Sequence, residues 1–224
     1  MNGCRRFRIK ICGMTRLDDA LCAVEAGVDA LGFIFYQQSS RAITPPAARA
    51  IIEQLPPFVD AVGVFVNEEL GRVTEIIRDC GLGYAQLHGA ESPAYCRELA
   101  VLVTPCRVLK AIRVGEETTA AEVARYHEVV RGYLLDTYQK DVVGGTGHAF
   151  DWDLIDRLQL NKPILLAGGL DVGNIREALE RVRPYGVDAN SGLEDAPGVK
   201  DHDLIRRFIA TVRSVEAHCS ARQQ

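Results

Sequence analysis

The chain has 224 residues, of which 47% are hydrophobic and 25% are charged, and its net charge at pH 7 is -4. This is the composition of an ordinary globular protein that can bury a sizeable core, and the length suits one domain. Because the basic residues form no block and no apolar run reaches the roughly 18 residues of a membrane helix, we expect no nucleic-acid partner, no membrane partner and a cytoplasmic location.

Short apolar segments that predict β-strands alternate along the chain with amphipathic segments that predict helices. The strands are expected at residues 8–12, 29–35, 59–66, 83–87, 106–112, 132–136, 163–167 and 186–189. The clearest helical stripes are Leu70, Val73, Ile76, Ile77 and Cys80, then Ile175, Ala178, Leu179 and Val182, then Leu204, Ile205, Phe208, Ile209 and Val212. The polar tail 215–224 is expected to fray.

The spacing of these strands indicates the fold class. Segments such as 30–36 and 61–66 are apolar throughout, which is typical of parallel strands that are buried on both faces. A new strand starts about every 21 to 30 residues, the length of a strand plus a crossover helix, and eight such units can close a barrel. We therefore predict an α/β fold, a (β/α)8 TIM barrel in which residues 1–224 form a single domain. An open, doubly wound sheet is the alternative.

Catalytic groups in such a barrel come from the carboxyl ends of the strands. Cys12 ends the first predicted strand and Asp136 ends the sixth, so the two side chains could face each other across a small substrate, although Asp136 could also cap a turn. His88 follows the fourth strand and is either a base, a substrate contact or a structural donor. Arg41 follows the second strand, where it could bind a carboxylate or phosphate bidentately or be solvated.

The last two strand-to-helix loops have the composition of a phosphate site. Gly168 and Gly169 follow the seventh strand, and Asn190, Ser191 and Gly192 follow the eighth. Small residues at these junctions let backbone N–H groups converge on an anion, and barrels frequently bind phosphate between these two loops. A tight turn alone would also explain the glycine pair, but the adjacent loop favours the phosphate site.

Neither the cysteines nor the histidines form a metal-binding pattern. The cysteines are seven, an odd number, with no Cys-x-x-Cys pair, so we expect reduced thiols. The histidines show no HxxxH spacing, and we predict no metal. The longest connection, residues 137–150, is rich in glycine and is predicted to be a lid.

A set of ordered motifs extends over nearly the whole chain. The motifs are residues 10–16 (KICGMTR), 31–35 (LGFIF), 62–67 (VGVFVN), 86–89 (QLHG), Asp136, 144–147 (GGTG), 150–152 (FDW), 166–170 (LAGGL), Asp188, Ser191, Gly192, 197–198 (PG) and 200–201 (KD). Together they resemble the phosphoribosylanthranilate isomerase family of tryptophan biosynthesis. Two positions depart from the usual pattern of that family, Ser40 in place of a proline and Asn190 in place of a common serine.

The resemblance implies an enzyme that catalyses an Amadori rearrangement without a cofactor. A small phosphorylated aminosugar, N-(5-phosphoribosyl)anthranilate, would become 1-(2-carboxyphenylamino)-1-deoxyribulose 5-phosphate. Residue by residue, the resemblance makes Cys12 the base and Asp136 the acid, and it assigns the anthranilate carboxylate to Arg41 and a further substrate contact to Asp188. The phosphate would be bound by Gly168, Gly169, Ser191 and Gly192.

This mechanism requires Asp136 to carry a proton while Cys12 loses one, which inverts their intrinsic order of acidity. Lys10 or a helix N-terminus could stabilise the thiolate, but strand alternation places Lys10 one layer deeper than Cys12, which argues against it. The alternatives are the histidine-pathway aminosugar isomerase, a dual-substrate isomerase, or a non-catalytic phosphoribosyl sensor. We expect a monomer or homodimer.

Overall fold

The computed structural model describes residues 6–136 and 153–221, so the predicted lid at 137–150 lies outside the described residues. Its central feature is a closed barrel in which β1 to β8 follow each other in chain order. The strands are β1 (Arg8–Ile11), β2 (Ala30–Ile34), β3 (Asp60–Phe65), β4 (Tyr84–Leu87), β5 (Arg107–Arg113), β6 (Gly132–Asp136), β7 (Ile164–Ala167) and β8 (Gly186–Ala189). Because β8 pairs in parallel with β1, the predicted barrel is confirmed and the open sheet is excluded.

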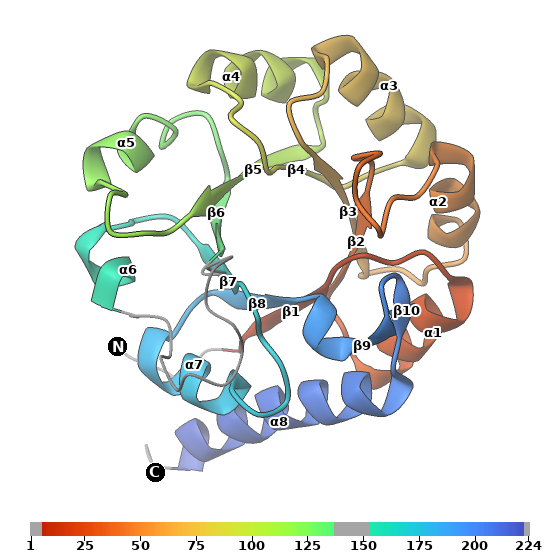
Figure 1. The fold of residues 1–224 in the computed structure, drawn as a ribbon, viewed down its shortest axis with the longest axis vertical. Coiled ribbons are helices and arrows are strands. Elements are labelled where there is room, and N and C mark those ends of the chain that lie inside the picture. Colours follow the sequence, from red (N-terminus) through yellow and green to blue (C-terminus); the bar gives the residue numbers. More distant parts are fainter. Residues whose placement is uncertain (1–5, 137–152, 222–224) are drawn as a thin grey trace.

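Helices surround the barrel on the outside, as Figure 1 shows in a view along the barrel axis. They are α1 (Leu17–Ala26), α2 (Pro45–Ile52), α3 (Leu70–Cys80), α4 (Pro93–Leu102), α5 (Ala120–Ala124), α6 (Asp153–Arg157), α7 (Ile175–Val182) and α8 (His202–Ala221). The stripes predicted on α3 and α7 match these helices, whereas α8 extends well beyond its predicted stripe. Among the described residues, no helix has the length and apolar character needed to cross a membrane.

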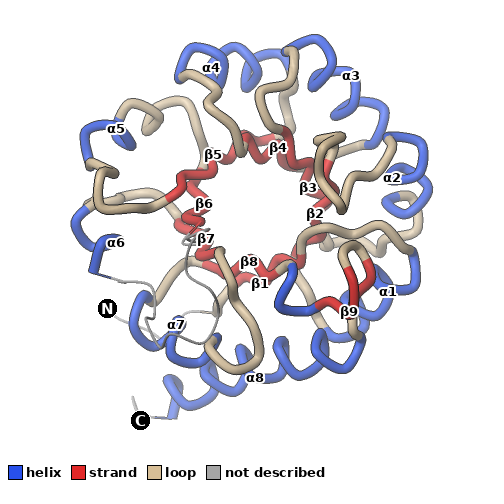
Figure 2. Tube along the Cα trace, in the orientation of Figure 1, coloured by secondary structure: helices blue, strands red, loops and turns tan. Residues whose placement is uncertain are grey.

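The segment between β8 and α8 departs from the regular strand-helix alternation. It contains a short 3-10 helix, η1 (Ser191–Leu193), and a small antiparallel ribbon of β9 (Glu194–Ala196) and β10 (Val199–Lys200). Figure 2 shows this ribbon beside the barrel, next to α1. The insertion brings Glu194 and Lys200 to the mouth of the barrel, which the sequence pattern did not predict.

Burial explains why the strands are apolar on both faces. Outward-facing side chains such as Ile9, Leu31 and Phe33 are fully buried under the helices and belong to the main core. A separate small cluster of Cys12, Ile34 and Val64 lies apart from this core. Two-sided burial is the reason that the strand bounds could be predicted to within one residue.

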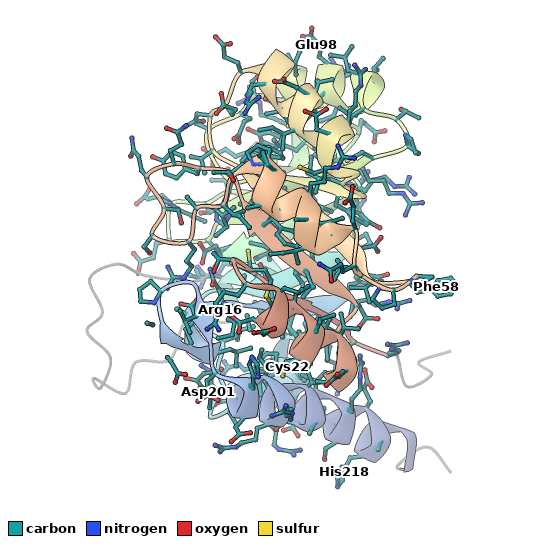
Figure 3. The ribbon with its side chains drawn as sticks, turned by 90° about the vertical axis from the view of Figure 1, so that its right-hand side faces the viewer. Arg16, Cys22, Phe58, Glu98, Asp201 and His218 are labelled. Atoms are coloured by element: carbon teal, nitrogen blue, oxygen red, sulfur yellow. The ribbon has the colours of Figure 1, made fainter. Side chains whose placement is uncertain are left out.

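The carboxyl end of the barrel strands can be identified in a side view of the molecule. Figure 3, a side view, places Arg16, which follows β1, and Phe58, which precedes β3, toward opposite ends of the molecule. The end near Arg16 is the carboxyl end of the strands, where barrel enzymes bind their substrates. The site described next lies at that end.

Candidate active site

A cavity at the carboxyl end of the barrel strands contains the residues selected from the sequence. Its lining consists of Cys12, Ile34, Arg41, Val64, Gln86, His88, Asp136, Ala167, Gly168, Gly169, Leu170, Asp188, Asn190, Ser191 and Gly192. All nine residues that the sequence analysis selected are in this set. The fold thus brings together side chains from the ends of β1, β4, β6 and β8 with the two glycine-containing loops that follow β7 and β8.

Cys12 leaves β1 just after its last residue and is buried, with 5% of its surface exposed. Its backbone N–H donates to the carbonyl of Ala189 at 2.8 Å, which fixes the end of β1 against β8. Burial raises the pKa of the Cys12 thiol, while the ammonium groups of Lys10 and Lys200 act in the opposite direction. A thiolate at Cys12 would therefore depend on these two lysines for its stabilisation.

Lys10 lies close enough to Cys12 to influence it, so the expectation that it sits too deep is wrong. A Cβ atom on Gly32 would lie 2.7 Å from Cys12 Sγ and 3.1 Å from Lys10 Cε, which shows that both side chains crowd the same position on β2. The long Lys10 side chain extends upward past the layer in which its Cα atom lies. Glycine at position 32 leaves the space in which the two groups meet.

Asp188 neutralises Lys10 inside the barrel. Lys10 Nζ donates to Asp188 Oδ2 at 2.7 Å, and the two side chains are 2% and 7% exposed. Burial alone would lower the pKa of Lys10, but Asp188 and Cys12 outweigh it, so the pKa of Lys10 is raised and the ammonium is retained. Asp188 Oδ1 has no hydrogen-bond partner within the described part of the chain, so it can accept a hydrogen bond from a ligand hydroxyl group.

Asp136 ends β6 and is joined to β4 through His88. His88 Nε2 lies 3.3 Å from Asp136 Oδ2, and His88 Nδ1 lies 3.0 Å from Gln86 Nε2. The Asp136 and His88 side chains are about one-fifth exposed, whereas Gln86 is buried. Asp136 therefore has a partner that can exchange hydrogen-bond roles with it, because a histidine ring nitrogen can either donate or accept.

Arg41 reaches the cavity but is already paired with a carboxylate of the chain. Its Nη2 donates to Glu194 Oε2 at 2.6 Å, and its Nε donates to both Glu194 oxygens at 2.9 Å. Lys200 Nζ donates to the same carboxylate at 2.8 Å and also to Asn190 Oδ1 at 2.9 Å. Burial acts to raise the pKa of Glu194, but Arg41 and Lys200 outweigh it, and the net pKa is lowered.

The two predicted phosphate loops adjoin each other. Gly168 and Gly169 have φ angles of 95° and 64°, which only glycine adopts without strain. A Cβ atom on Gly192 would overlap the backbone carbonyl oxygen of Leu170, so the loop after β8 packs directly against the loop after β7. The two loops form one continuous wall of the cavity, and its backbone is accessible at close range because it carries few side chains.

Several site residues were missed in the sequence analysis. Gln86, Gly32 and Lys200 all lie within motifs, but their types gave no reason to assign them a role. Glu194 lies in no motif, and only the ribbon after β8 brings its carboxylate to Arg41. Among the described residues, no group of three or more His, Cys, Asp or Glu side chains is arranged to hold a metal ion, and Cys12, Cys22, Cys80, Cys96 and Cys106 are free thiols.

A closed (β/α)8 barrel with a polar, glycine-lined cavity at the carboxyl ends of its strands defines the class of TIM-barrel enzymes, which bind their substrates at that end. Comparison with protein families narrows this class. The family described as N-(5'-phosphoribosyl)anthranilate (PRA) isomerase matches residues 9–211. The chain therefore belongs to this family of isomerases of tryptophan biosynthesis, and the resemblance read from its motifs is confirmed.

Individual relatives agree with the family assignment. The N-(5'-phosphoribosyl)anthranilate isomerase of Trichlorobacter lovleyi is 48% identical over 208 residues, which is 92% of this chain and 98% of the relative. A solved phosphoribosyl anthranilate isomerase in complex with reduced 1-(o-carboxyphenylamino)-1-deoxyribulose 5-phosphate is 41% identical, with a TM-score of 0.78 over 93% of this chain and 99% of that one. Monomers of the dimeric Thermotoga maritima isomerase are also 41% identical, with a TM-score of 0.80 and the same coverage.

Proposed function

We propose that this chain converts N-(5-phosphoribosyl)anthranilate to 1-(2-carboxyphenylamino)-1-deoxyribulose 5-phosphate, with Asp136 as the acid and Cys12 as the base. The observation that carries the assignment is the shared cavity. A thiol from β1 and a carboxyl group from β6 line it together with Arg41 and two glycine loops. The family supplies the reaction, and the cavity supplies groups for both proton transfers and for both anionic ends of the substrate.

The first step opens the ribose ring. Asp136 donates its proton to the ring oxygen, the bond between that oxygen and C1 breaks, and the electron pair of the anthranilate nitrogen forms an iminium with C1. His88 lies 3.3 Å from Asp136 and can keep it in position. A positioned acid is typically worth about 10² to 10⁴ in rate.

The second step removes the proton from C2. The iminium makes this proton acidic, and the Cys12 thiolate accepts it, so the C2–H electrons form the C1–C2 double bond of an enolamine. Ketonisation of the enolamine, in which C1 gains a proton and the C2 hydroxyl loses one, completes the product; C2 is oxidised as C1 is reduced, so there is no net redox change. Burial disfavours the thiolate, so Lys10 has to remain charged for this step. Its ion pair with Asp188 keeps the ammonium group charged, and the ammonium group in turn stabilises the Cys12 thiolate.

The remaining contacts bind the substrate. Gly168, Gly169, Ser191 and Gly192 bind the phosphate through the wall that their loops form. Asp188 Oδ1 accepts from a sugar hydroxyl, since it is buried and lacks a partner among the described residues. The guanidinium edge of Arg41 that Glu194 does not occupy binds the anthranilate carboxylate.

Steady-state turnover of freshly prepared substrate tests the assignment. We expect Cys12→Ala and Asp136→Asn to lower kcat by about 10² or more, while Cys22→Ala, which removes a buried thiol outside the cavity, stays near the parent rate. Near-normal kcat in Cys12→Ala would refute the base assignment. If the parent chain turned over neither this substrate nor the histidine-pathway aminosugar, a non-catalytic sensor would replace the proposal.

The histidine-pathway reaction is the second candidate, because it is the same rearrangement on a larger bisphosphate. A cysteine at the end of β1, and one wall of glycine loops, favour the smaller monophosphate substrate. Assaying both substrates side by side distinguishes a single from a dual specificity. We also propose a cytoplasmic location, which can be tested by cell fractionation. We propose that the protein is a monomer or a homodimer, which can be tested by sedimentation equilibrium.

A further inference from the structure

A chain of polar contacts runs from Gln86 in β4 through His88, which follows β4, to the proposed acid Asp136 at the end of β6. Gln86 Nε2 lies 3.0 Å from His88 Nδ1, and His88 Nε2 lies 3.3 Å from Asp136 Oδ2. The backbone N–H of His88 also donates to the carbonyl of Phe65 at 2.8 Å, so the backbone that carries the ring is tied to β3. The two contacts use the two nitrogens of one imidazole ring. The hydrogen bond between His88 and Asp136 therefore depends on the one between His88 and Gln86.

The amide group of Gln86 fixes what His88 can do. An amide NH₂ can only donate, so when Nε2 faces His88, ring atom Nδ1 has to accept and a neutral ring carries its proton on Nε2. His88 then donates to Asp136, which is the arrangement for an ionised carboxylate. This is the state in which the acid has already given up its proton.

Rotation of the amide by half a turn produces the complementary arrangement. Oε1 then faces His88 and accepts from Nδ1–H, so the neutral ring has a lone pair on Nε2 and can accept a hydrogen bond from protonated Asp136. The shape of the side chain is the same in both orientations, because the amide oxygen and nitrogen are nearly equal in size.

The surroundings of Gln86 leave this choice open. The side chain is 1% exposed, and Oε1 has no hydrogen-bond partner among the described residues, so no second contact in that part of the chain holds the amide in one orientation. A buried amide oxygen without a hydrogen bond lowers the stability of the fold, so such an atom calls for a functional explanation.

We propose that Gln86 is a positioning residue for the acid step: its amide selects which ring nitrogen of His88 carries the proton, and thereby whether His88 accepts from protonated Asp136 or donates to its carboxylate. The inference rests on the proposed role of Asp136. It adds a residue that touches neither reacting atom and acts only through His88.

The tautomer of His88 can be observed without any turnover. In ¹⁵N-labelled protein at pH 8.5 we expect the two ring nitrogens of His88 to show the separate shifts of a single neutral tautomer. His127, which is partly buried and whose ring makes no hydrogen bond with the described residues, serves as an internal reference for an averaged ring. Gln86→Met, which keeps the length but cannot donate or accept, should move His88 toward that average.

Gln86→Glu provides a second variant with the opposite property. Its carboxylate can only accept, so Nδ1 of His88 should be protonated in this variant. Thermal midpoints show whether each variant is folded. An averaged His88 in the parent chain, or a Gln86→Met spectrum identical to that of the parent, would overturn the inference.

Kinetics separate a positioning role from a structural one. We expect Gln86→Met to lower kcat about 10-fold with KM within twofold, and to change kcat less than twofold when His88 is already Asn. Equal losses in both backgrounds would mean that Gln86 acts on the barrel rather than through His88. If the parent chain lacked turnover, the proposed function would fail while the spectra still decided the role of Gln86.

Discussion

Glu194 holds Arg41 by one edge of its guanidinium group, with Nη2 and Nε both within 2.9 Å of the carboxylate. The Arg41 side chain is 21% exposed and that of Glu194 only 4%. Nη1 has a weaker contact, 3.4 Å to Ser40 Oγ, so it lies on the edge that a ligand carboxylate can approach. Arg41 is thus oriented by a carboxylate of its own protein and not by the backbone of its loop alone.

Replacing Glu194 with glutamine should destabilise the protein. The change removes the charge that Arg41 and buried Lys200 share, and we expect a loss of about 3 kcal/mol in the free energy of unfolding, because a buried cation is left uncompensated. Urea denaturation at pH 7 measures the loss. The same variant should raise KM more than it lowers kcat, since it loosens Arg41 and not the catalytic pair.

An exposed ion pair of similar geometry provides the control. Arg49 Nε lies 2.7 Å from Glu53 Oε1, but both side chains are about 60% exposed. Glu53→Gln should leave the urea midpoint unchanged, because solvent screens this pair. If the two substitutions lowered the free energy of unfolding equally, burial would not explain the contribution of the Glu194 ion pairs to stability.

The barrel could be predicted from sequence because burial on both faces leaves a local signature in every strand. The cavity could be located for the same reason, since each strand end is read directly from the chain. The ion pair between Arg41 and Glu194 joins positions 153 residues apart through an irregular ribbon, and no periodic pattern encodes that contact. The reach of Lys10 also could not be predicted, because it depends on the space left by Gly32 on the next strand.

Lys10 should control the ionisation of Cys12. Lys10→Met keeps the length of the side chain but removes the charge that opposes the effect of burial, so the pKa of Cys12 should rise further. We expect alkylation of Cys12 by iodoacetamide at pH 8.5 to slow several-fold, as followed by peptide mass spectrometry, while Cys22 in the same sample reports on general accessibility. A variant that alkylates as fast as the parent would exclude Lys10 as the stabilising cation.

The contact between the two glycine loops should govern phosphate affinity. In Gly192→Ala the new methyl group would overlap the carbonyl oxygen of Leu170, so the loop after β8 has to move away from the loop after β7. We expect KM to rise at least 10-fold and inhibition by inorganic phosphate to weaken in parallel, because backbone N–H groups no longer converge. Gly71→Ala on α3, where a Cβ meets nothing within 4 Å, is the matched control and should retain both values. Unchanged phosphate inhibition in Gly192→Ala would remove this wall from the phosphate site.

Asp29 connects the beginning of the barrel to the last helix, and its effect on stability should depend on pH. Its carboxylate accepts hydrogen bonds from Arg8 at 2.7 Å, from the backbone of Ile9 at 3.0 Å and from Arg213 at 3.2 Å. Burial acts to raise the pKa of Asp29, but these contacts outweigh it and lower the pKa below its ordinary value of 3.8. The carboxylate therefore stabilises the fold above that value, and this stabilisation is lost as the pH falls through the lowered pKa.

Asp29→Asn should accordingly cost about 1–2 kcal/mol at pH 7, and the gap from the parent chain should narrow once the pH drops below about 4. Asp60 offers the opposite case, because burial raises its pKa and the nearby Arg107 and Arg8 only partly offset the effect. Asp60→Asn should therefore cost nothing at pH 7, because desolvation acts against the charge of this carboxylate and the amide carries none. Urea titrations of both variants between pH 7 and pH 3 measure these differences. A gap for Asp29→Asn that stayed constant down to pH 3 would mean that the amide loses packing or geometry rather than charge, and that the network around Asp29 is not held by its ionised form.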